Sequence, residues 1–214
     1  MSAAREAELV VATGNEGKLR EFRSLLRALP LALRSLREFA GVELPEEGED
    51  YEQNALAKAL VAARQTGLPA LADDSGLEVE GLGGAPGPRS ARYGGPGLDD
   101  AGRALHLLSA LRGRSGDARR ARFVCVAALA LPDGEAWSAR GECAGVVLEA
   151  PRGRGGFGYD PVFWSSEAGA CVAELPDDRK NEISHRGRAL RALRARIEER
   201  VLAGSPVRPD PDRG

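Results

Sequence analysis

The stretch VVATGNEGKLREF, residues 10–22, decides the fold of this chain. It begins with apolar residues that are typical of the end of a buried strand. Gly14 and Gly17 then frame a turn, after which Leu19 and Phe22 recur at helical spacing. A strand, a glycine turn and a helix in this order predict an α/β domain.

The same turn is a candidate for phosphate binding. Asn15 can cap the helix, and Lys18 falls in its first turn, where the helix dipole disfavours a cation. A bound anion would compensate, because a helix N-terminus offers free N–H groups. The pattern is not a Walker motif, since two residues separate the glycines and Leu19 follows Lys18. The alternative is a solvated lysine beside an ordinary turn.

The composition of the 214 residues narrows the function classes. The net charge of −2 gives no global basic field that would recruit nucleic acid or an anionic membrane. Cys125, Cys143 and Cys171 are widely spaced, and we expect buried thiols in a reducing compartment. The N-terminus has no long apolar segment, so we expect no signal peptide or membrane span and a cytoplasmic protein.

Lysine is rare in this chain. Lys18, Lys58 and Lys180 are its three lysines, and arginine supplies nearly all other positive charge. A lysine here therefore suggests a choice of chemistry rather than general surface charge.

The order of apolar patterns predicts one α/β domain over residues 1–203, built on a mixed sheet with flanking helices. A polar, proline-rich tail over residues 204–214 is predicted to be disordered. Residues 132–134 read as the turn of a hairpin. We expect helices over residues 51–64, 99–111 and from Ser184 onwards, and strands over residues 9–12, 70–72, 77–80, 122–131, 136–148 and 171–175.

Acidic residues offer candidate metal ligands. Asp73, Asp74 and Ser75 follow an apolar strand, and adjacent strand residues point to opposite faces. A carboxylate at a strand end beside glycine loops suits Mg²⁺, although a turn capped by aspartate is the alternative. Glu46 and Glu47 add carboxylates in a loop, where solvated charge is the simpler interpretation.

The stretch GGFGYDP, residues 155–161, lets the backbone approach a ligand closely. Phe157 and Tyr159 are among the few aromatic residues, and stacking on a base would explain them. The alternative is a structural turn with aromatic anchors.

The stretch KNEISHRGRAL, residues 180–190, gathers cations around a predicted helix N-terminus. Lys180, His185 and Arg186 there imply an anion or a polar ligand. From the residues alone, His185 fits a general base, a hydrogen-bond donor to a ligand or a satisfied surface residue.

Five stretches follow one another from about Leu9 to the last helix: ATGNEGKLREF, EQNALAKA, ADDSGLEVEGLGGAPGPRSARY, GGFGYDPVF and KNEISHRGRAL. In this order they resemble the inosine triphosphate pyrophosphatases, which clear non-standard purine nucleotides. The resemblance implies a homodimer with an α/β fold around a long curved mixed sheet. It also implies Mg²⁺-dependent hydrolysis of ITP, dITP and XTP to the monophosphate and pyrophosphate.

The resemblance also implies site residues. Asp74 would be the catalytic carboxylate and a metal ligand, with Glu46 as the second metal ligand and Glu47 as its alternative. The match loosens here, because PEEGEDYEQNA carries an extra acid and Asp50-Tyr51 where the family has a Thr-Phe pair. The substrate-binding residues would be Thr13, Gly14, Asn15, Glu16, Gly17, Lys18, Ser75, Phe157, Gly158, Tyr159, Asp160, Lys180, His185 and Arg186.

These roles combine into one mechanism. Asp74 would position or deprotonate a water that attacks the α-phosphorus, and Lys18 and Lys180 would stabilise charge on the leaving pyrophosphate. Donors at the keto edge of the base would come from Arg186, His185 and backbone N–H groups near Phe157. A pyrophosphatase for other modified nucleotides and a nucleotide sensor that does not hydrolyse are the alternatives.

Overall fold

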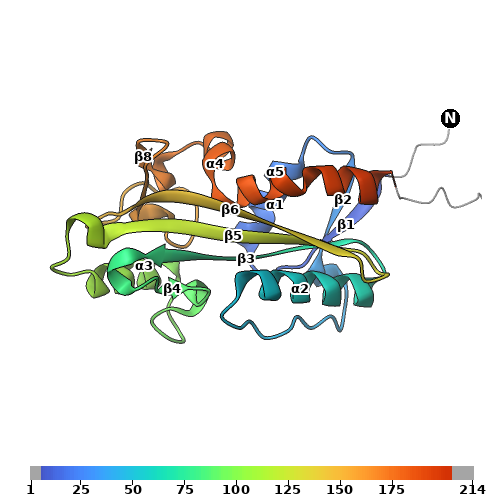
Figure 1. Cartoon of the computed structure of the whole chain (residues 1–214), viewed down its shortest axis with the longest axis horizontal. Coiled ribbons are helices and arrows are strands. Elements are labelled where there is room, and N and C mark those ends of the chain that lie inside the picture. The colour runs from blue at the N-terminus through green and yellow to red at the C-terminus, as the bar shows by residue number, and fades with distance from the viewer. Residues whose placement is uncertain (1–5, 204–214) are drawn as a thin grey trace, which may run out of the picture.

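The computed structural model describes residues 6–203, which form a mixed β-sheet with helices on both faces (Figure 1). Residues 1–5 and the predicted tail, 204–214, lie outside the described residues. The strands are β1 (Ala7–Val11), β2 (Leu31–Ser35), β3 (Ala70–Val79), β4 (Pro86–Gly87), β5 (Arg120–Ala130), β6 (Ala136–Val147), β7 (Phe163–Ser165) and β8 (Ala170–Cys171). The helices are α1 (Glu16–Leu26), α2 (Tyr51–Thr66), α3 (Asp100–Ala110), α4 (Asp177–Ile183) and α5 (His185–Ile197), and a π-helical turn over Glu198–Leu202 extends α5.

Neighbouring strands follow the order β2-β1-β3-β5-β6-β7-β8, and β4 also pairs with β3. β1 runs parallel to β2 and β3, while the other pairs are antiparallel. This arrangement confirms the predicted α/β fold on a mixed sheet. The predicted hairpin is also confirmed, because β5 and β6 pair along their whole length. Figure 1 shows that β3, β5 and β6 are the long strands of the molecule.

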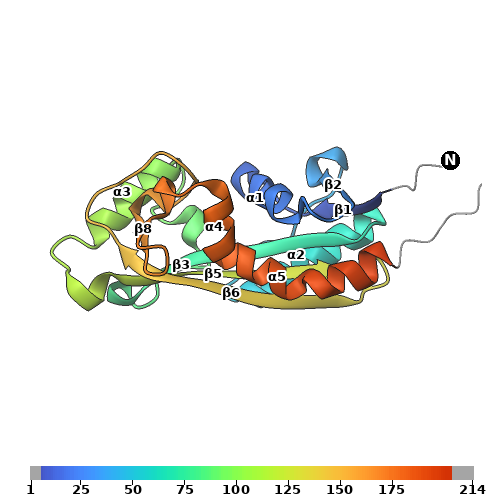
Figure 2. The same cartoon turned by 90° about the horizontal axis from the view of Figure 1, so that it is seen from above.

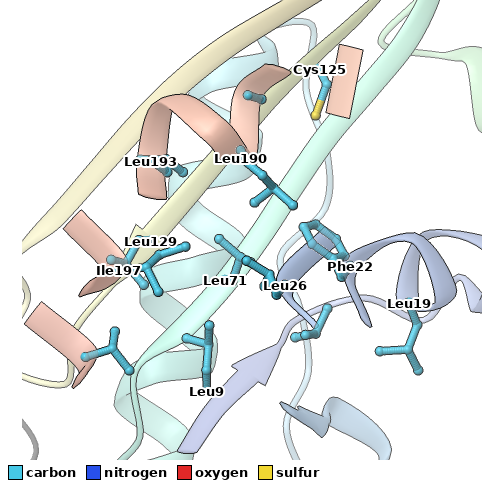
Figure 3. Packing of buried hydrophobic residues seen from close by; sticks show 14 of the residues in the cluster. Leu9, Leu19, Phe22, Leu26, Leu71, Cys125, Leu129, Leu190, Leu193 and Ile197 are labelled. Atoms are coloured by element: carbon cyan, nitrogen blue, oxygen red, sulfur yellow. The ribbon is translucent and has the colours of Figure 1, made fainter. Parts of the chain in front are cut away.

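The alternation of side chains along the strands divides the core into two layers. Leu9 and Leu71 face α1 and α5, whereas Val10 and Ala72 face α2. Figure 3 shows the first layer, in which Phe22 of α1 and the leucines of α5 lie over the sheet. β1 and β3 therefore each carry apolar side chains to helices on both faces of the sheet.

Helix α5 has the predicted apolar stripe. Leu190, Leu193, Ile197 and Val201 are all buried against the sheet. The helix begins after Ser184, whose hydroxyl accepts a hydrogen bond from the N–H of Gly187 at 3.0 Å. The predicted cap and the predicted stripe are both confirmed.

Helix α2 lies close to the opposite face because its buried side chains are small. Ala55, Ala59, Ala62 and Ala63 are fully buried there. The helix ends at Gly67, whose φ of 69° is the left-handed conformation that glycine adopts most easily. The helix predicted over residues 51–64 is confirmed.

Strand β3 differs from the prediction of two short strands. It continues through Asp73 and Asp74, because β5 pairs with every residue from Ala70 to Val79. The two carboxylates therefore lie in the middle of a strand and not at its end. The alternation of their directions is as predicted.

Two other strands also differ from the sequence prediction. β2 (Leu31–Ser35) was not predicted, because it is an edge strand that is mostly half-buried and lacks clear alternation. The strand predicted over residues 171–175 is limited to Ala170–Cys171, and Val172–Glu174 forms a 3₁₀ turn.

The edge of β3 that faces β1 is not paired with another strand in its middle part. β1 pairs with β3 only through Ala70 and Leu71, and β4 pairs with it only at Leu77 and Glu78. No strand within residues 6–203 pairs with this edge between these two points. Figure 2 shows α1 and α3 above the same side of the long strands, separated along their length. The strand order also reverses beside this edge, because β2 lies on one side of β1 and β3 on the other, and ligands of open α/β sheets bind at such points.

The three cysteines are free and buried, as predicted. None of the helices in the described part of the chain is long and apolar enough to cross a membrane.

Candidate active site

A cleft of about 220 Å³ lies above the sheet between α1 on one side and α3 with the loop over residues 157–160 on the other. Its floor includes Ser75, Gly76 and Leu77 of β3. The structure brings many of the predicted substrate-binding residues to this cleft. Those that line it are Asn15, Lys18, Ser75, Phe157, Gly158, Tyr159, Asp160, Lys180, His185 and Arg186.

The predicted phosphate turn is held by its own polar side chains. The Asn15 side chain accepts a hydrogen bond from the Lys18 N–H at 3.0 Å, which confirms the predicted cap. The Thr13 hydroxyl accepts from the Asn15 N–H at 3.1 Å, and Glu16 pairs with Arg37. This turn places the Lys18 side chain at the mouth of the cleft, where it is 16% exposed.

Two glycines of the turn have different roles. A Cβ at Gly17 would lie 2.6 Å from the Phe157 ring, so only glycine lets that ring lie against the start of α1. Gly14 has open space at the same position, and its carbonyl accepts a hydrogen bond from Arg37.

Asp73 is a buried anion of β3 beside the cleft, two residues before Ser75. Its Oδ2 lies 2.8 Å from Arg186 Nη2 and 3.2 Å from Lys18 Nζ. Burial alone would raise the pKa of Asp73, but the charges of Arg186, Lys18 and Lys58 hold that pKa well below its usual range. Asp73 is therefore ionised and fixes both cations beside β3.

Arg186 is fully buried beneath the cleft. Its Nε and Nη2 donate to Asp73, Nη1 donates to Glu21, and Nη2 also donates to Ser75 at 3.0 Å. Each guanidinium nitrogen thus already donates a hydrogen bond to a protein oxygen.

Lys180 is held between two carboxylates. Its Nζ lies 2.6 Å from both Glu21 Oε1 and Asp160 Oδ2, and 4.9 Å from the centre of the Phe157 ring. Burial would raise the pKa of Glu21, but the charges of Arg186 and Lys180 lower it to about 2. Lys180 lies inside the short helix α4 and not at a helix N-terminus as we expected.

His185 is neutral in this environment. Its ring stacks on Phe123 with the centroids 4.8 Å apart and the planes 11° apart. Burial, together with the charge of Arg186, lowers the pKa of His185 to about 3. The interpretation of His185 as a surface residue is therefore wrong, and such a pKa makes it a weak base.

The two aromatic residues of the 155–161 loop are placed differently. Tyr159 is buried, and its hydroxyl donates to the Ser90 carbonyl at 2.9 Å, as a structural anchor does. Phe157 is half-buried and lines the cleft. Phe157 is thus the better placed of the two for contact with a ligand.

Asp74 faces the other side of β3, toward α2. Its Oδ2 accepts a hydrogen bond from Asn54 Nδ2 at 2.7 Å, and its Oδ1 accepts from the Ser75 N–H at 3.1 Å. Lys58 Nζ is 3.7 Å from Oδ1. Burial outweighs these favourable contacts and raises the pKa of Asp74 above its usual value.

The second carboxylate near Asp74 is Glu47, whose Oε1 is 2.5 Å from Lys58 Nζ. Burial would raise the pKa of Glu47, but the hydrogen bond and charge of Lys58 keep it below its usual value. Glu46, the expected second metal ligand, is exposed in the same loop. The structure thus brings Glu47, the alternative, toward Asp74.

The donors around Asp74 are compatible with a hard divalent cation. No group of three or more His, Cys, Asp or Glu residues that could hold a metal occurs between residues 6 and 203. Mg²⁺ needs only one or two carboxylates when water and phosphate oxygens complete its shell. Asp74 and Glu47, bridged by the Lys58 ammonium, form an anionic pair of this kind.

Some residues of the site were not predicted as site residues. Asn54 and Lys58 are separated by four positions on α2, and both are buried among alanines. Two polar residues at helical spacing within the alanine-rich stretch EQNALAKA could have indicated these site residues from the sequence. Glu21 and Arg103 gave no such signal, because their positions in the cleft depend on how α1 and α3 pack.

Comparison with known proteins identifies relatives along most of the chain. The model of the Ham1 family matches residues 9–196. A dITP/XTP pyrophosphatase of Geobacter sulfurreducens is 53% identical over 87% of this chain and 94% of its own length. A dITP/XTP pyrophosphatase of Thermus thermophilus is 53% identical over 88% of this chain and 91% of its own length.

Solved structures agree with the relatives found by sequence. A HAM1 protein from Coxiella burnetii superposes with a TM-score of 0.80 and 42% identity, covering 90% of this chain and 99% of that one. The Ham1 protein of Staphylococcus aureus gives a TM-score of 0.78 with 35% identity, covering 90% and 98% of the two chains.

Proposed function

The chain belongs to the Ham1 family, and we propose that its cleft hydrolyses the non-standard purine nucleotides ITP, dITP and XTP to the nucleoside monophosphate and pyrophosphate. This makes it a hydrolase of phosphoric anhydrides. The observation that carries the proposal is the Asp74 carboxylate at the open edge of β3, next to Lys58 and to the turn that bears Lys18.

The triphosphate lies around the open edge of β3. Ser75 joins the two sides of this edge, because it lines the cleft while its N–H binds Asp74. The charge of Lys18 also reaches both carboxylates. It opposes the rise that burial gives to the pKa of Asp74, and it adds to Lys58 in keeping the pKa of Glu47 low. A nucleotide whose base occupies the cleft can therefore present its phosphates to Asp74.

Asp74 positions and deprotonates the attacking water. Asn54 holds its Oδ2 at 2.7 Å, which fixes the carboxylate plane. Its raised pKa makes Asp74 a stronger base than an exposed aspartate. The water attacks the α-phosphorus in line, and the P–O bond to the leaving pyrophosphate breaks.

Two lysines neutralise the phosphate charge. Lys18 and Lys58 lie on either side of the open edge and bind the triphosphate as point charges. Lys180, which we expected in this role, is held by two carboxylates beside Phe157. Lys180 therefore acts at the base end of the cleft.

We propose Mg²⁺ as the metal, held by Asp74 and Glu47 together with substrate oxygens and water. When bound, it neutralises triphosphate charge that the lysines alone do not cover. The chain's net charge of −2 supports a small-molecule substrate and not nucleic acid as the partner. A cytoplasmic homodimer completes the proposal, and the three free cysteines support a reducing compartment.

Product analysis tests this function. ITP, ATP and GTP are incubated with the protein in Mg²⁺, and orthophosphate is assayed before and after addition of an inorganic pyrophosphatase. We expect IMP and pyrophosphate from ITP, while ATP and GTP persist. Orthophosphate without the added enzyme, equal cleavage of ATP, or binding of ITP without any product would contradict the proposal.

A further inference from the structure

Two of the three groups expected to read the base, Arg186 and the backbone N–H groups near Phe157, are largely engaged within the protein. Each nitrogen of Arg186 already donates to a protein oxygen. The Phe157 N–H donates to Asp160 at 2.8 Å, and the Gly158 N–H donates to Asp100 at 2.8 Å. The neutral His185 ring offers one N–H, so any further uncommitted donor must come from elsewhere in the cleft.

Arg103 is such a donor. It lines the cleft from α3, and its side chain is 19% exposed. Its nearest carboxylate, Asp100, is 3.9 Å from Nη1, whereas Lys180 and Arg186 each contact carboxylates within 2.8 Å. Its Nε is buried, and no residue in the described range 6–203 accepts a hydrogen bond from it.

Helix α3 directs Arg103 toward the loop over residues 157–160. Arg103 and the buried Leu107 are four residues apart, so they share the face of α3 that packs on the sheet. Side chains on a helix lean toward its N-terminus, and in α3 the first turn is tied to Gly158 through Asp100. Burial raises the pKa of Tyr159 in that loop, and the charge of Arg103 opposes this rise.

The position of Arg103 also needs compensation. It lies in the first turn of α3, where the helix dipole disfavours a cation. A guanidinium can donate but cannot accept hydrogen bonds, so its ligand must offer an acceptor atom. The acceptors on the nucleoside half of a purine nucleotide include keto oxygens of the base and hydroxyl oxygens of the sugar.

We propose that Arg103 is a specificity-determining residue that donates a hydrogen bond to an oxygen of the nucleoside. This inference rests on the proposed function and adds a substrate contact to it. Two oxygens vary among the proposed substrates: the 2-keto oxygen, which XTP has and ITP lacks, and the 2′-hydroxyl, which ITP has and dITP lacks. Arg103 reads one of them.

The test compares kcat/KM for ITP, XTP and dITP in the full-length protein and its Arg103→Gln variant. We expect the variant to lose about 10-fold to 100-fold on the substrate that carries the contacted oxygen, the range for a hydrogen bond from a charged donor. A fall in the XTP/ITP ratio assigns the base oxygen, and a fall in the ITP/dITP ratio assigns the sugar oxygen. Either fall supports the proposal.

Matched variants separate this contact from other effects. Arg112→Gln removes the same charge from an exposed position just after α3, and it should leave both ratios unchanged. Arg103→Lys keeps the charge and a donor, and it should restore part of the lost ratio. Thermal unfolding of each variant identifies any that fail to fold.

An equal loss on all three substrates, or no change in either ratio, would overturn the role of Arg103. Failure of the wild-type protein to release pyrophosphate from any of the three would instead overturn the proposed function. The two failures are therefore distinguishable.

Discussion

Asp73 and Asp74 are neighbours in the sequence, yet β3 sends them into opposite environments. Asp73 meets Arg186 at 2.8 Å and Lys18 at 3.2 Å, and its pKa is held far below the usual range. Asp74 meets one amide and a more distant ammonium, and its pKa is raised. Two titratable groups whose environments push their pKa values apart indicate different roles. Asp73 holds Arg186 and Lys18 in place, and we propose Asp74 as the base.

The largest expected effect of this difference is on turnover. Asp74→Asn removes the base and should lower kcat by about 10²–10⁴-fold, the usual contribution of a general base. Circular dichroism should show unchanged folding, because the new amide keeps the size of the side chain. Asp117→Asn, at an exposed carboxylate that pairs with Arg120, is the matched control and should keep normal activity. A near-normal rate in Asp74→Asn would remove the role we assign to it.

The second largest effect is on the free energy of unfolding, and we expect it from substitution of Asp73. Asp73→Asn leaves Arg186 buried with reduced compensation, and loss of one partner of a buried ion pair costs about 3–5 kcal/mol. Urea unfolding measures this loss directly. Asp74→Asn should show no comparable loss, because its carboxylate is disfavoured by burial in the folded protein. Equal destabilisation by both substitutions would contradict the different roles that we assign to Asp73 and Asp74.

Glu47 and Glu46 give a sharper form of the same comparison. Glu47 contacts Lys58 beside Asp74, whereas Glu46 is exposed. We expect Glu47→Gln to raise the Mg²⁺ concentration for half-maximal activity by about 10-fold or more, as removal of groups that support a metal site does. Glu46→Gln is the control with the same chemistry and should stay close to wild type. A large effect of Glu46→Gln with little effect of Glu47→Gln would instead indicate Glu46 as the metal ligand.

The smallest effect is a pH dependence of stability that comes from His185. An unfolded histidine binds a proton below a pH of about 6.5, whereas the folded group, with a pKa of about 3, does not. Its contribution to stability is therefore present above pH 6.5 and is lost as the pH falls toward 3. The slope from one such group is at most about 1.4 kcal/mol per pH unit.

His185→Gln should flatten this slope between pH 6.5 and 5, a window above the range in which most carboxylates titrate. Urea unfolding of both proteins at several pH values in that window measures the change. An unchanged slope would mean that His185 does not have the low pKa assigned to it.

The periodic parts of the fold could be predicted from the sequence. The stripe of α5 and the hairpin of β5 and β6 repeat clearly, and both are present in the structure. The alternation of Asp73 and Asp74 also follows from strand geometry alone. β2 could not be predicted, since its burial depends on α1 and on its neighbour β1.

The parts of the site that could not be predicted depend on distant contacts. Arg186 meets Asp73 across 113 positions and Glu21 across 165 positions, and no local pattern reports such pairs. The rarity of lysine was the better signal. All three lysines lie at the site in contact with carboxylates: Lys18 with Asp73, Lys58 with Glu47 and Lys180 with both Glu21 and Asp160.

The measurement that tests the central claim most directly is ITP hydrolysis in ¹⁸O-labelled water, with mass analysis of both products. The proposed role of Asp74 is to deliver water to the α-phosphorus, so we expect the label in IMP and not in pyrophosphate. The same label should enter IMP far more slowly with Asp74→Asn, while Asp73→Asn that remains folded should retain the labelling pattern. Label in pyrophosphate would place the attack on the β-phosphorus and contradict the assignment of the water to Asp74.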